Sequence, residues 1–125
     1  AKIQTGLLAF VCFESADVES TINQFIKKIS EFTFFDDNRG VMASNLKEID
    51  GELMLVSQFT LAAITNKGNK PSFHKAAKTD DARLLYNQLI QKLDQSSINY
   101  QSGEFGANMN VALVNAGPVT FSFNF

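Results

Sequence analysis

The chain has 125 residues, with 11 basic and 13 acidic side chains, one histidine and one cysteine. A chain of this length forms one domain that buries roughly two thirds of the surface its unfolded form exposes, so neither a disulfide nor a metal is needed for folding. The net charge of −2 argues against a protein that coats duplex nucleic acid. Because Cys12 has no partner in the chain and neither a membrane span nor a signal peptide is recognisable, we expect a cytoplasmic protein.

The first third of the chain predicts a strand followed by an amphipathic helix. Residues 7–13 are apolar throughout, as in a central strand. Ser15 or Asp17 is suited to cap the helix that follows. The apolar face of this helix repeats at helical spacing and contains Val18, Ile22, Phe25, Ile26 and Ile29.

Two short strands and two turns are predicted next. Residues 31–35 favour a strand, and residues 36–40 form a turn cluster in which Gly40 can take positive φ. Residues 42–46 favour an edge strand, which Asp50 and Gly51 connect by a turn to the next segment.

Residues 53–61 form the segment around which the predicted fold is organised. The run is apolar without alternation up to Val56, which is typical of a strand covered on both faces. It then becomes polar at Ser57, Gln58 and Thr60. Ligands of α/β proteins bind beyond the carboxyl ends of buried strands, so the sequence predicts a site at this end.

The second half predicts another helix and the remaining strands. The helix begins at Thr79 and ends near Gln95, after a loop over residues 65–72. Its buried face consists of Ala82, Leu85, Tyr86, Leu89 and Leu93. Strands are expected at residues 98–101, 108–114 and 119–125, with a loop at residues 103–107 and a turn at residues 116–118. Two helices and about six strands predict an α/β fold, with mixed β-sheets on which the helices pack, as one domain over residues 1–125.

A local cluster of positive charge lies in the loop before the second helix. Its members are Lys67, Lys70, Lys75 and Lys78, together with His74, and no acidic residue interrupts them. Two interpretations are equally favoured: a solvated loop, or a patch that contacts the phosphates at the end of a nucleic acid.

Conventional catalytic sets are absent from the sequence. One histidine and one cysteine do not make a metal site, and neither a nucleophile elbow nor a glycine-rich phosphate loop occurs. A Ser57 or Thr60 nucleophile with His74 as its base lacks a carboxylate to orient the imidazole. Chemistry at this site would therefore use backbone groups or the atoms of the substrate.

Four short motifs resemble those of D-aminoacyl-tRNA deacylases. Residues 57–61 read Ser-Gln-Phe-Thr-Leu and residues 115–120 read Asn-Ala-Gly-Pro-Val-Thr, which match the family signatures Ser-Gln-x-x-Leu and Asn-x-Gly-Pro-x-Thr. Pro-Ser-Phe at residues 71–73 and Gly-x-Phe-Gly-Ala-x-Met at residues 103–109 match in order and approximate spacing. Four motifs in register over nearly the whole chain make the resemblance specific.

The resemblance implies a three-layer β/β/α fold and a homodimer. It implies an enzyme that hydrolyses the ester of a D-aminoacyl-tRNA, as a chirality proofreading step that admits glycine as well. The tRNA 3′ end is the expected partner, and no cofactor or metal is expected. Family members normally begin with a further strand ahead of the region that matches Lys2, and many have an acidic residue where this chain has Ala116.

The resemblance also assigns roles to residues. Catalysis is assigned to the strand end at Ser57, Gln58, Phe59 and Thr60, where backbone N–H groups hold the ester carbonyl. A cis peptide between Gly117 and Pro118 of one subunit is expected to reach the substrate's α-ammonium in the other. Substrate contacts are further assigned to Leu61, Phe105, Met109 and Asn115, and phosphate contacts to Lys67, Lys70 and Lys75.

Several of these residues have a structural alternative. Thr60 is a nucleophile or makes a structural hydrogen bond, and Gln58 is a ligand contact or a satisfied amide. Phe105 is a stacking platform or part of the core, and Asn115 contacts substrate or caps the turn. For the whole chain, the alternatives are a non-catalytic dimeric module that binds a small ligand or a tRNA end, and a proofreader of small L-amino acids.

Overall fold

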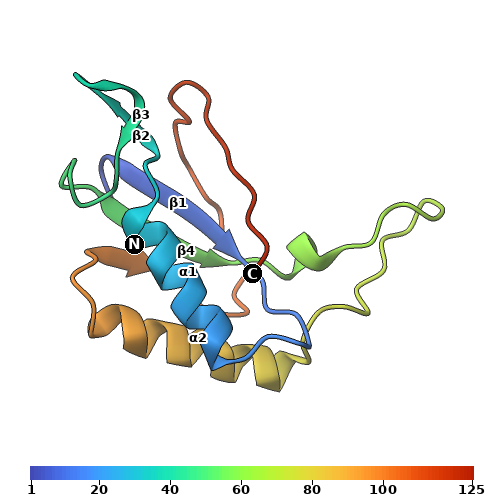
Figure 1. Ribbon diagram of the computed structural model, residues 1–125. Helices are drawn as coiled ribbons and strands as arrows, with labels where there is room; N and C mark the ends of the chain where they lie inside the picture. Colours follow the sequence, from blue (N-terminus) through green and yellow to red (C-terminus); the bar gives the residue numbers. More distant parts are fainter.

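The computed structural model describes all residues from Ala1 to Phe125 (Figure 1). It contains two sheets and two helices, which confirms the predicted fold class. The elements in chain order are β1 (Gly6–Val11), α1 (Glu19–Glu31), β2 (Phe35–Asp37), β3 (Gly40–Ser44), β4 (Glu52–Ser57), the 3₁₀ turn η1 (Phe59–Ala62), α2 (Thr79–Asp94) and β5 (Tyr100–Ser102). Parallel and antiparallel pairing occur in separate sheets.

The larger sheet is parallel and has the strand order β1-β4-β5. Its central strand, β4, pairs with β1 through Leu53 opposite Leu7 and with β5 through Leu55 opposite Ser102. Leu53 and Leu55 have 0% of their surface exposed, and Val56 on the opposite face has 6%. The prediction that this apolar run forms a strand covered on both faces is confirmed.

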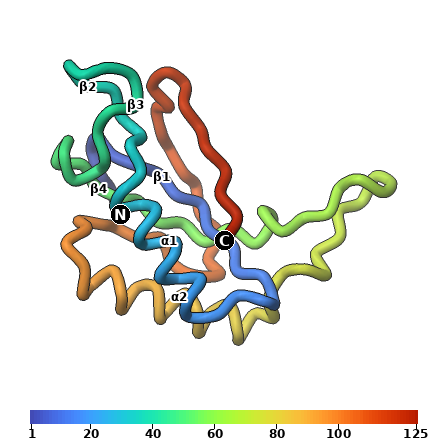
Figure 2. The backbone as a smooth tube through the Cα atoms, in the orientation of Figure 1, coloured from blue at the N-terminus to red at the C-terminus, as the bar shows by residue number.

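Both helices pack on the face of the parallel sheet to which Leu53 and Leu55 point, and they contact each other there (Figures 1 and 2). The buried core between the helices and the parallel sheet consists of Ile22, Ile29, Leu46, Leu53, Leu55, Tyr86, Leu89 and Leu93. Helical spacing of the apolar residues therefore predicted the buried faces of both helices, except at Val18, which precedes α1 and is exposed. Neither helix has the length and hydropathy that crossing a membrane requires.

The first helix begins later than the sequence predicted. Its N-cap position is Val18, whose side chain is 56% exposed, and the Val18 N–H donates to Thr21 Oγ1 at 3.1 Å. Asp17 instead accepts a hydrogen bond from the Glu14 N–H at 2.7 Å, so its carboxylate stabilises the preceding loop. The predicted cap at Ser15 or Asp17 is wrong because this local side-chain hydrogen bond competes with capping.

The second sheet is a two-stranded antiparallel hairpin formed by β2 and β3. Helix α1 continues to Glu31, so the strand predicted at residues 31–35 begins four residues later, at Phe35. Arg39 links the hairpin to the following loop through Asp37 at 2.7 Å and Glu48 at 3.0 Å. The Arg39 guanidinium, with a smaller contribution from the Ser44 hydroxyl, holds the pKa of Asp37 well below its ordinary value.

The C-terminal arm, residues 107–125, contains no strand, so the strands predicted at residues 108–114 and 119–125 are wrong. The predicted alternation is nevertheless present, because Phe121 and Phe123 both contact Phe32, with ring centroids 5.3 Å apart in each pair. What is missing is a neighbouring backbone to which the extended arm can hydrogen-bond. Figure 2 shows the arm as a long open loop beside the sheet.

Truncation of Leu55 tests the central position of β4. Leu55→Ala should lower the free energy of unfolding by about 3 kcal/mol, because it removes the isopropyl group from a site with no exposed surface. Leu84→Ala on α2, where the side chain is 59% exposed, is the matched control and should change it by less than about 1 kcal/mol. Urea denaturation measures both, and equal losses would contradict the packing described above.

Candidate active site

The candidate site lies where β4 ends. The strand stops at Ser57, the Gln58 N–H donates to the Val11 carbonyl at 2.7 Å, and the chain then turns into η1. The sequence predicted that the strand continues to Leu61, but the four residues from Phe59 form a single 3₁₀ turn. The polar residues that follow the buried run mark this change of direction.

Two backbone donors are left free at the start of η1. Phe59 and Thr60 are its first two residues, so their N–H groups have no acceptor within the turn. Neither N–H takes part in the turn, loop or side-chain hydrogen bonds of the chain. The side chain of Phe59 is 62% exposed, so the turn is open to solvent. Adjacent free donors of this kind bind anionic or polarised oxygen atoms.

The side chains around these donors do not form a nucleophile and base. Gln58 Nε2 donates to Thr60 Oγ1 at 3.0 Å, which is the kind of contact expected if Thr60 makes a structural hydrogen bond. His74 Nδ1 is hydrogen-bonded to Ser72 Oγ at 3.0 Å and to neither Ser57 nor Thr60. The dyad considered in the sequence is therefore not formed. No group of three or more His, Cys, Asp or Glu side chains is arranged to hold a metal ion.

Cys12 supports η1 from the end of β1, a role the sequence did not indicate. Its Sγ lies 3.5 Å from the Phe59 carbonyl, to which the thiol donates. Burial raises the pKa of the Cys12 thiol, so it stays protonated and able to donate near neutral pH. On the outer side, the Phe73 ring contacts the Phe59 ring, with centroids 5.0 Å apart. Both contacts restrict where η1 can lie.

The loop that contains Phe105 begins beside β4. The Gly103 N–H donates to the Leu55 carbonyl at 2.8 Å, and a Cβ at Gly103 would lie 2.6 Å from Met109 Sδ. Phe105 is half-buried and contacts Tyr86, with ring centroids 5.4 Å apart. The structure therefore places Phe105 and Met109 at the carboxyl end of the parallel sheet, on a loop that packs against α2.

The Gly-Pro motif lies at the turn of the C-terminal arm. Its peptide bond is cis, as the resemblance implied. Asn115 spans the turn, since its Oδ1 accepts from the Val119 N–H at 2.9 Å and its Nδ2 donates to Thr120 Oγ1 at 3.0 Å. Figure 1 shows this turn, in red, well away from η1, in green. Within one chain the two signature motifs are therefore not brought together.

The basic loop extends from the body of the protein on the side of η1 (Figure 1). Its base is closed by reciprocal backbone hydrogen bonds between Ile64 and Ser72, at 2.7 and 3.0 Å. Lys67 and Lys70 are exposed on it, and Lys75, also exposed, follows its base, where the Lys75 carbonyl accepts from the Ser15 N–H at 3.0 Å. Lys67 and Lys70 thus project on the side of η1, on a loop that leads back to Phe73, and Lys75 lies in the segment between Phe73 and α2.

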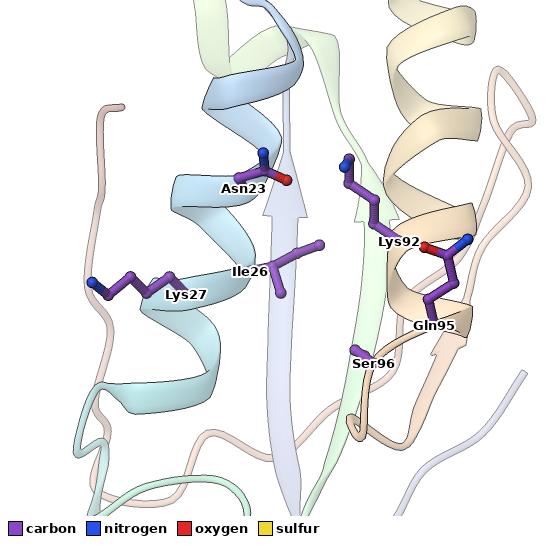
Figure 3. Close-up of a pocket in the computed structure, with 6 residues that line it drawn as sticks. All are labelled: Asn23, Ile26, Lys27, Lys92, Gln95 and Ser96. Carbon is purple, nitrogen blue, oxygen red and sulfur yellow. The ribbon is translucent and has the colours of Figure 1, made fainter.

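A hollow of about 310 Å³ between α1 and α2 was not predicted and lies away from η1 (Figure 3). Lys92 within it is paired with Glu19 at 3.0 Å, and Figure 3 shows the Lys27 side chain directed away from α2. A single apolar side chain, Ile26, lines it. Because Lys92 is already paired, Lys27 points away from α2 and the other lining side chains are mostly polar, this hollow adds nothing to the site.

Comparison with known proteins identifies the family. Residues 1–124 match the family model described as D-Tyr-tRNA(Tyr) deacylase. This chain belongs to that family. It is 46% identical over 121 residues to a D-aminoacyl-tRNA deacylase of Flavobacterium psychrophilum, covering 96% of this chain and 81% of the relative. It is 43% identical over 120 residues to a D-aminoacyl-tRNA deacylase of Finegoldia magna, with the same coverage of both chains.

Solved structures agree with the deacylase fold. A protein named c-Myc DNA unwinding element binding protein is 31% identical, with a TM-score of 0.85, over 94% of this chain and 80% of that chain. A probable eukaryotic D-amino acid tRNA deacylase is 15% identical, with a TM-score of 0.70, over 85% of this chain and 77% of that chain. At that identity the second similarity shows the fold alone.

Proposed function

We propose that this deacylase hydrolyses the ester that joins a D-amino acid to the 3′-terminal adenosine of tRNA. The family match over residues 1–124 supports the reaction, and the free N–H groups of Phe59 and Thr60 support the mechanism. Water and the ester are converted to a free D-amino acid and a tRNA with an intact 3′-hydroxyl. A protein that acts on aminoacyl-tRNA in this way works where translation occurs, in the cytoplasm.

The N–H groups of Phe59 and Thr60 hold the carbonyl oxygen of the ester. Attack by water places negative charge on this oxygen, and a fixed backbone donor aimed at it contributes about 10²–10³ in rate. Ser57 and Gln58 position the turn, because Gln58 is bonded to β1 through its backbone and to Thr60 through its side chain. The donors need no reorganisation when the charge develops.

The proton chemistry is left to the substrate. The 2′-hydroxyl of the terminal ribose lies next to the ester oxygen and can orient the attacking water or relay its proton to the departing 3′-oxygen. An aminoacyl ester is already activated, so a strong base is not required. This use of the substrate's own hydroxyl agrees with the lack of a side-chain base at the site: His74 is hydrogen-bonded to Ser72, and no paired carboxylates lie around η1.

We assign the choice between D and L substrates to a second copy of the chain. Because the Gly117-Pro118 turn lies far from η1 of its own chain, it can close a pocket only in a homodimer partner (Figure 1). There its carbonyl oxygens accept from the substrate's α-ammonium. Backbone placed close to Cα leaves space for hydrogen or a D side chain and excludes an L side chain by collision.

The remaining substrate contacts follow from the positions of the loops. Leu61 is 56% exposed on η1, where it is placed to contact the bound amino acid. Phe105 and Met109 contact the terminal adenine, and Asn115 holds the turn that carries Gly117 and Pro118. Lys67, Lys70 and Lys75 contact tRNA phosphates beyond the terminal nucleotide.

Release of D-tyrosine from D-Tyr-tRNA by the purified chain tests the function. The proposal expects rapid release from D-Tyr-tRNA, slower release from Gly-tRNA and background release from L-Tyr-tRNA. Binding of D-Tyr-tRNA without release, by a folded chain, would favour the non-catalytic module. Preferential release from L-Ala-tRNA would favour a proofreader of small L-amino acids.

Replacement of Thr60 tests the assignment of catalysis to backbone donors. Thr60→Ala should retain kcat for D-Tyr-tRNA within about 10-fold, because the lost group accepts a hydrogen bond from Gln58 and faces no base. Loss of a nucleophile costs about 10⁶-fold instead. Thr33→Ala, an exposed threonine outside the site, is the control. A fall to background with the fold intact would make Thr60 the nucleophile.

Replacement of Gly117 tests the turn of the C-terminal arm. Gly117 has φ of +133°, and an added Cβ would lie 2.8 Å from Val119 Cγ2. Gly117→Ala should therefore lower kcat/KM by about 5- to 150-fold, since a strained position costs about 1–3 kcal/mol. Gly40→Ala has a similar φ of +146° but no atom within 4 Å, and should keep wild-type activity. Equal kcat/KM for the two variants would show that the Gly117-Pro118 turn takes no part in the reaction.

A further inference from the structure

Arg83 is a cation without an anionic partner. The chain has two arginines, and Arg39 is neutralised by Asp37 and Glu48. Arg83 forms no salt bridge, although Asp80 and Asp81 lie in the same part of α2. Its side chain is exposed. A guanidinium in this state retains its full capacity to bind an anion.

The Arg83 guanidinium is ordered by an aromatic ring. Its Cζ lies 4.9 Å from the centroid of the Phe105 ring, within the range of a cation–π contact. Phe105 in turn contacts Tyr86, which is 4% exposed and donates through its hydroxyl to the Gly103 carbonyl at 3.0 Å. The guanidinium therefore rests on a stack that continues into the core. An ordered side chain loses less conformational entropy when it binds a ligand.

This stack lies at the edge of the sheet where the site is. The Gly103 N–H donates to the Leu55 carbonyl, two residues before Ser57. Strands β4 and β5 are parallel, so the loop after β5 and the turn after β4 leave the sheet at the same edge. Gly106, with φ of +76°, brings its backbone near Arg83, whose Nη2 would lie 3.9 Å from a Cβ there. Arg83 and Phe105 thus lie at the carboxyl end of the parallel sheet, the same end at which η1 lies.

We propose that Arg83 binds a phosphodiester of the tRNA 3′ end. This inference rests on the proposed function, because it takes the ester to be held at Phe59 and Thr60. The amino-acid carboxyl is esterified and carries no charge, so the anion nearest the reacting ester is the phosphate that links the terminal adenosine to the preceding nucleotide. The planar fork of a guanidinium matches two phosphate oxygens. Glu104, the neighbour of Phe105 in the sequence, forms no salt bridge with Arg83.

Arg83 differs from the lysines of the basic loop in what it can specify. Lys67 and Lys70 are exposed on an extended loop and Lys75 is exposed just after it, and these side chains supply attraction without a fixed geometry. The guanidinium held over Phe105 fixes the position of one phosphate relative to the sheet edge. A fixed phosphate sets the register in which the terminal nucleotide binds, so it raises the affinity of the sheet edge for the tRNA end.

Two substrates separate this contact from catalysis. One is D-Tyr-tRNA, and the other is the D-tyrosyl ester of adenosine, which has the same reacting bond and no phosphate. Arg83→Gln should raise KM for D-Tyr-tRNA by about 10-fold, with kcat within a factor of two, because a charge-assisted hydrogen bond is lost. The same variant should hydrolyse the adenosine ester with wild-type kinetics. Lys92→Gln, which removes a paired cation from the same helix, should leave both substrates unaffected.

Binding provides a readout that does not depend on turnover. Affinity of the wild-type chain for a fluorescent RNA ending in CCA, measured over a range of salt concentrations, gives the slope that counts phosphate contacts. Arg83→Gln should weaken binding by about 10-fold and reduce this slope by about 1, and Arg83→Lys should restore the slope. Thermal unfolding of each variant checks that the fold is kept.

Three results would overturn the proposal. They are an unchanged KM and salt slope in Arg83→Gln, an equal loss on the adenosine ester, and an Arg83→Lys variant that binds RNA with the reduced slope of Arg83→Gln. A wild-type chain that binds the RNA with the expected dependence on Arg83 and releases no D-tyrosine would contradict the proposed reaction and leave this contact supported.

Discussion

One hydrogen bond at the end of the central strand determines where the candidate site lies. The Gln58 N–H donates to the Val11 carbonyl at 2.7 Å, and beyond it the chain leaves the sheet. Leu53 and Leu55, with no exposed surface, fix β4 against both helices, so the position of this last hydrogen bond is set by the core. The free N–H groups of Phe59 and Thr60 follow directly from the turn that it starts.

Backbone donors suit a reaction whose substrate is already activated. They do not titrate, and their position is fixed by the strand rather than by a rotamer, so the protein needs to supply only a place for the developing charge. Two neighbouring residues hold η1 in place: the Cys12 thiol donates to the Phe59 carbonyl, and the Phe73 ring contacts the Phe59 ring. The proposed mechanism uses no catalytic side chain that a motif search could find, although the segment that supplies the donors is recognisable.

The predictions from sequence succeeded where burial decides the structure. The apolar run of β4 and the helical spacing in α1 and α2 each specify a buried face, and each is present. Boundaries were less accurate, because they depend on local competition: Asp17 bonds the Glu14 N–H instead of capping α1, and β4 gives way to η1 after Ser57. Alternation in residues 119–125 correctly predicted which Phe side chains share a side, but it carries no information on whether a backbone partner is present.

Contacts between distant segments were beyond prediction from one sequence. The match to the family motifs indicated the segments around Phe59, Phe105 and Gly117, but nothing in the spacing indicates that Arg83 rests on Phe105 or that Cys12 reaches Phe59. Both contacts join residues brought together by the parallel sheet. From the sequence alone, an arginine on a helix is interpreted as a solvent-exposed charge, and its contact with the Phe105 ring becomes known only from the structure.

The central claim is that the Phe59 and Thr60 N–H groups hold the carbonyl of the substrate. Amide chemical shifts, recorded by NMR while a non-hydrolysable 3′-amide analogue of the D-tyrosyl ester of adenosine is added, test it most directly. The account predicts that these two amide protons move downfield, as expected for new hydrogen bonds, and that they show the largest changes in the chain. Saturable binding of the analogue that leaves both amide resonances in place would contradict it.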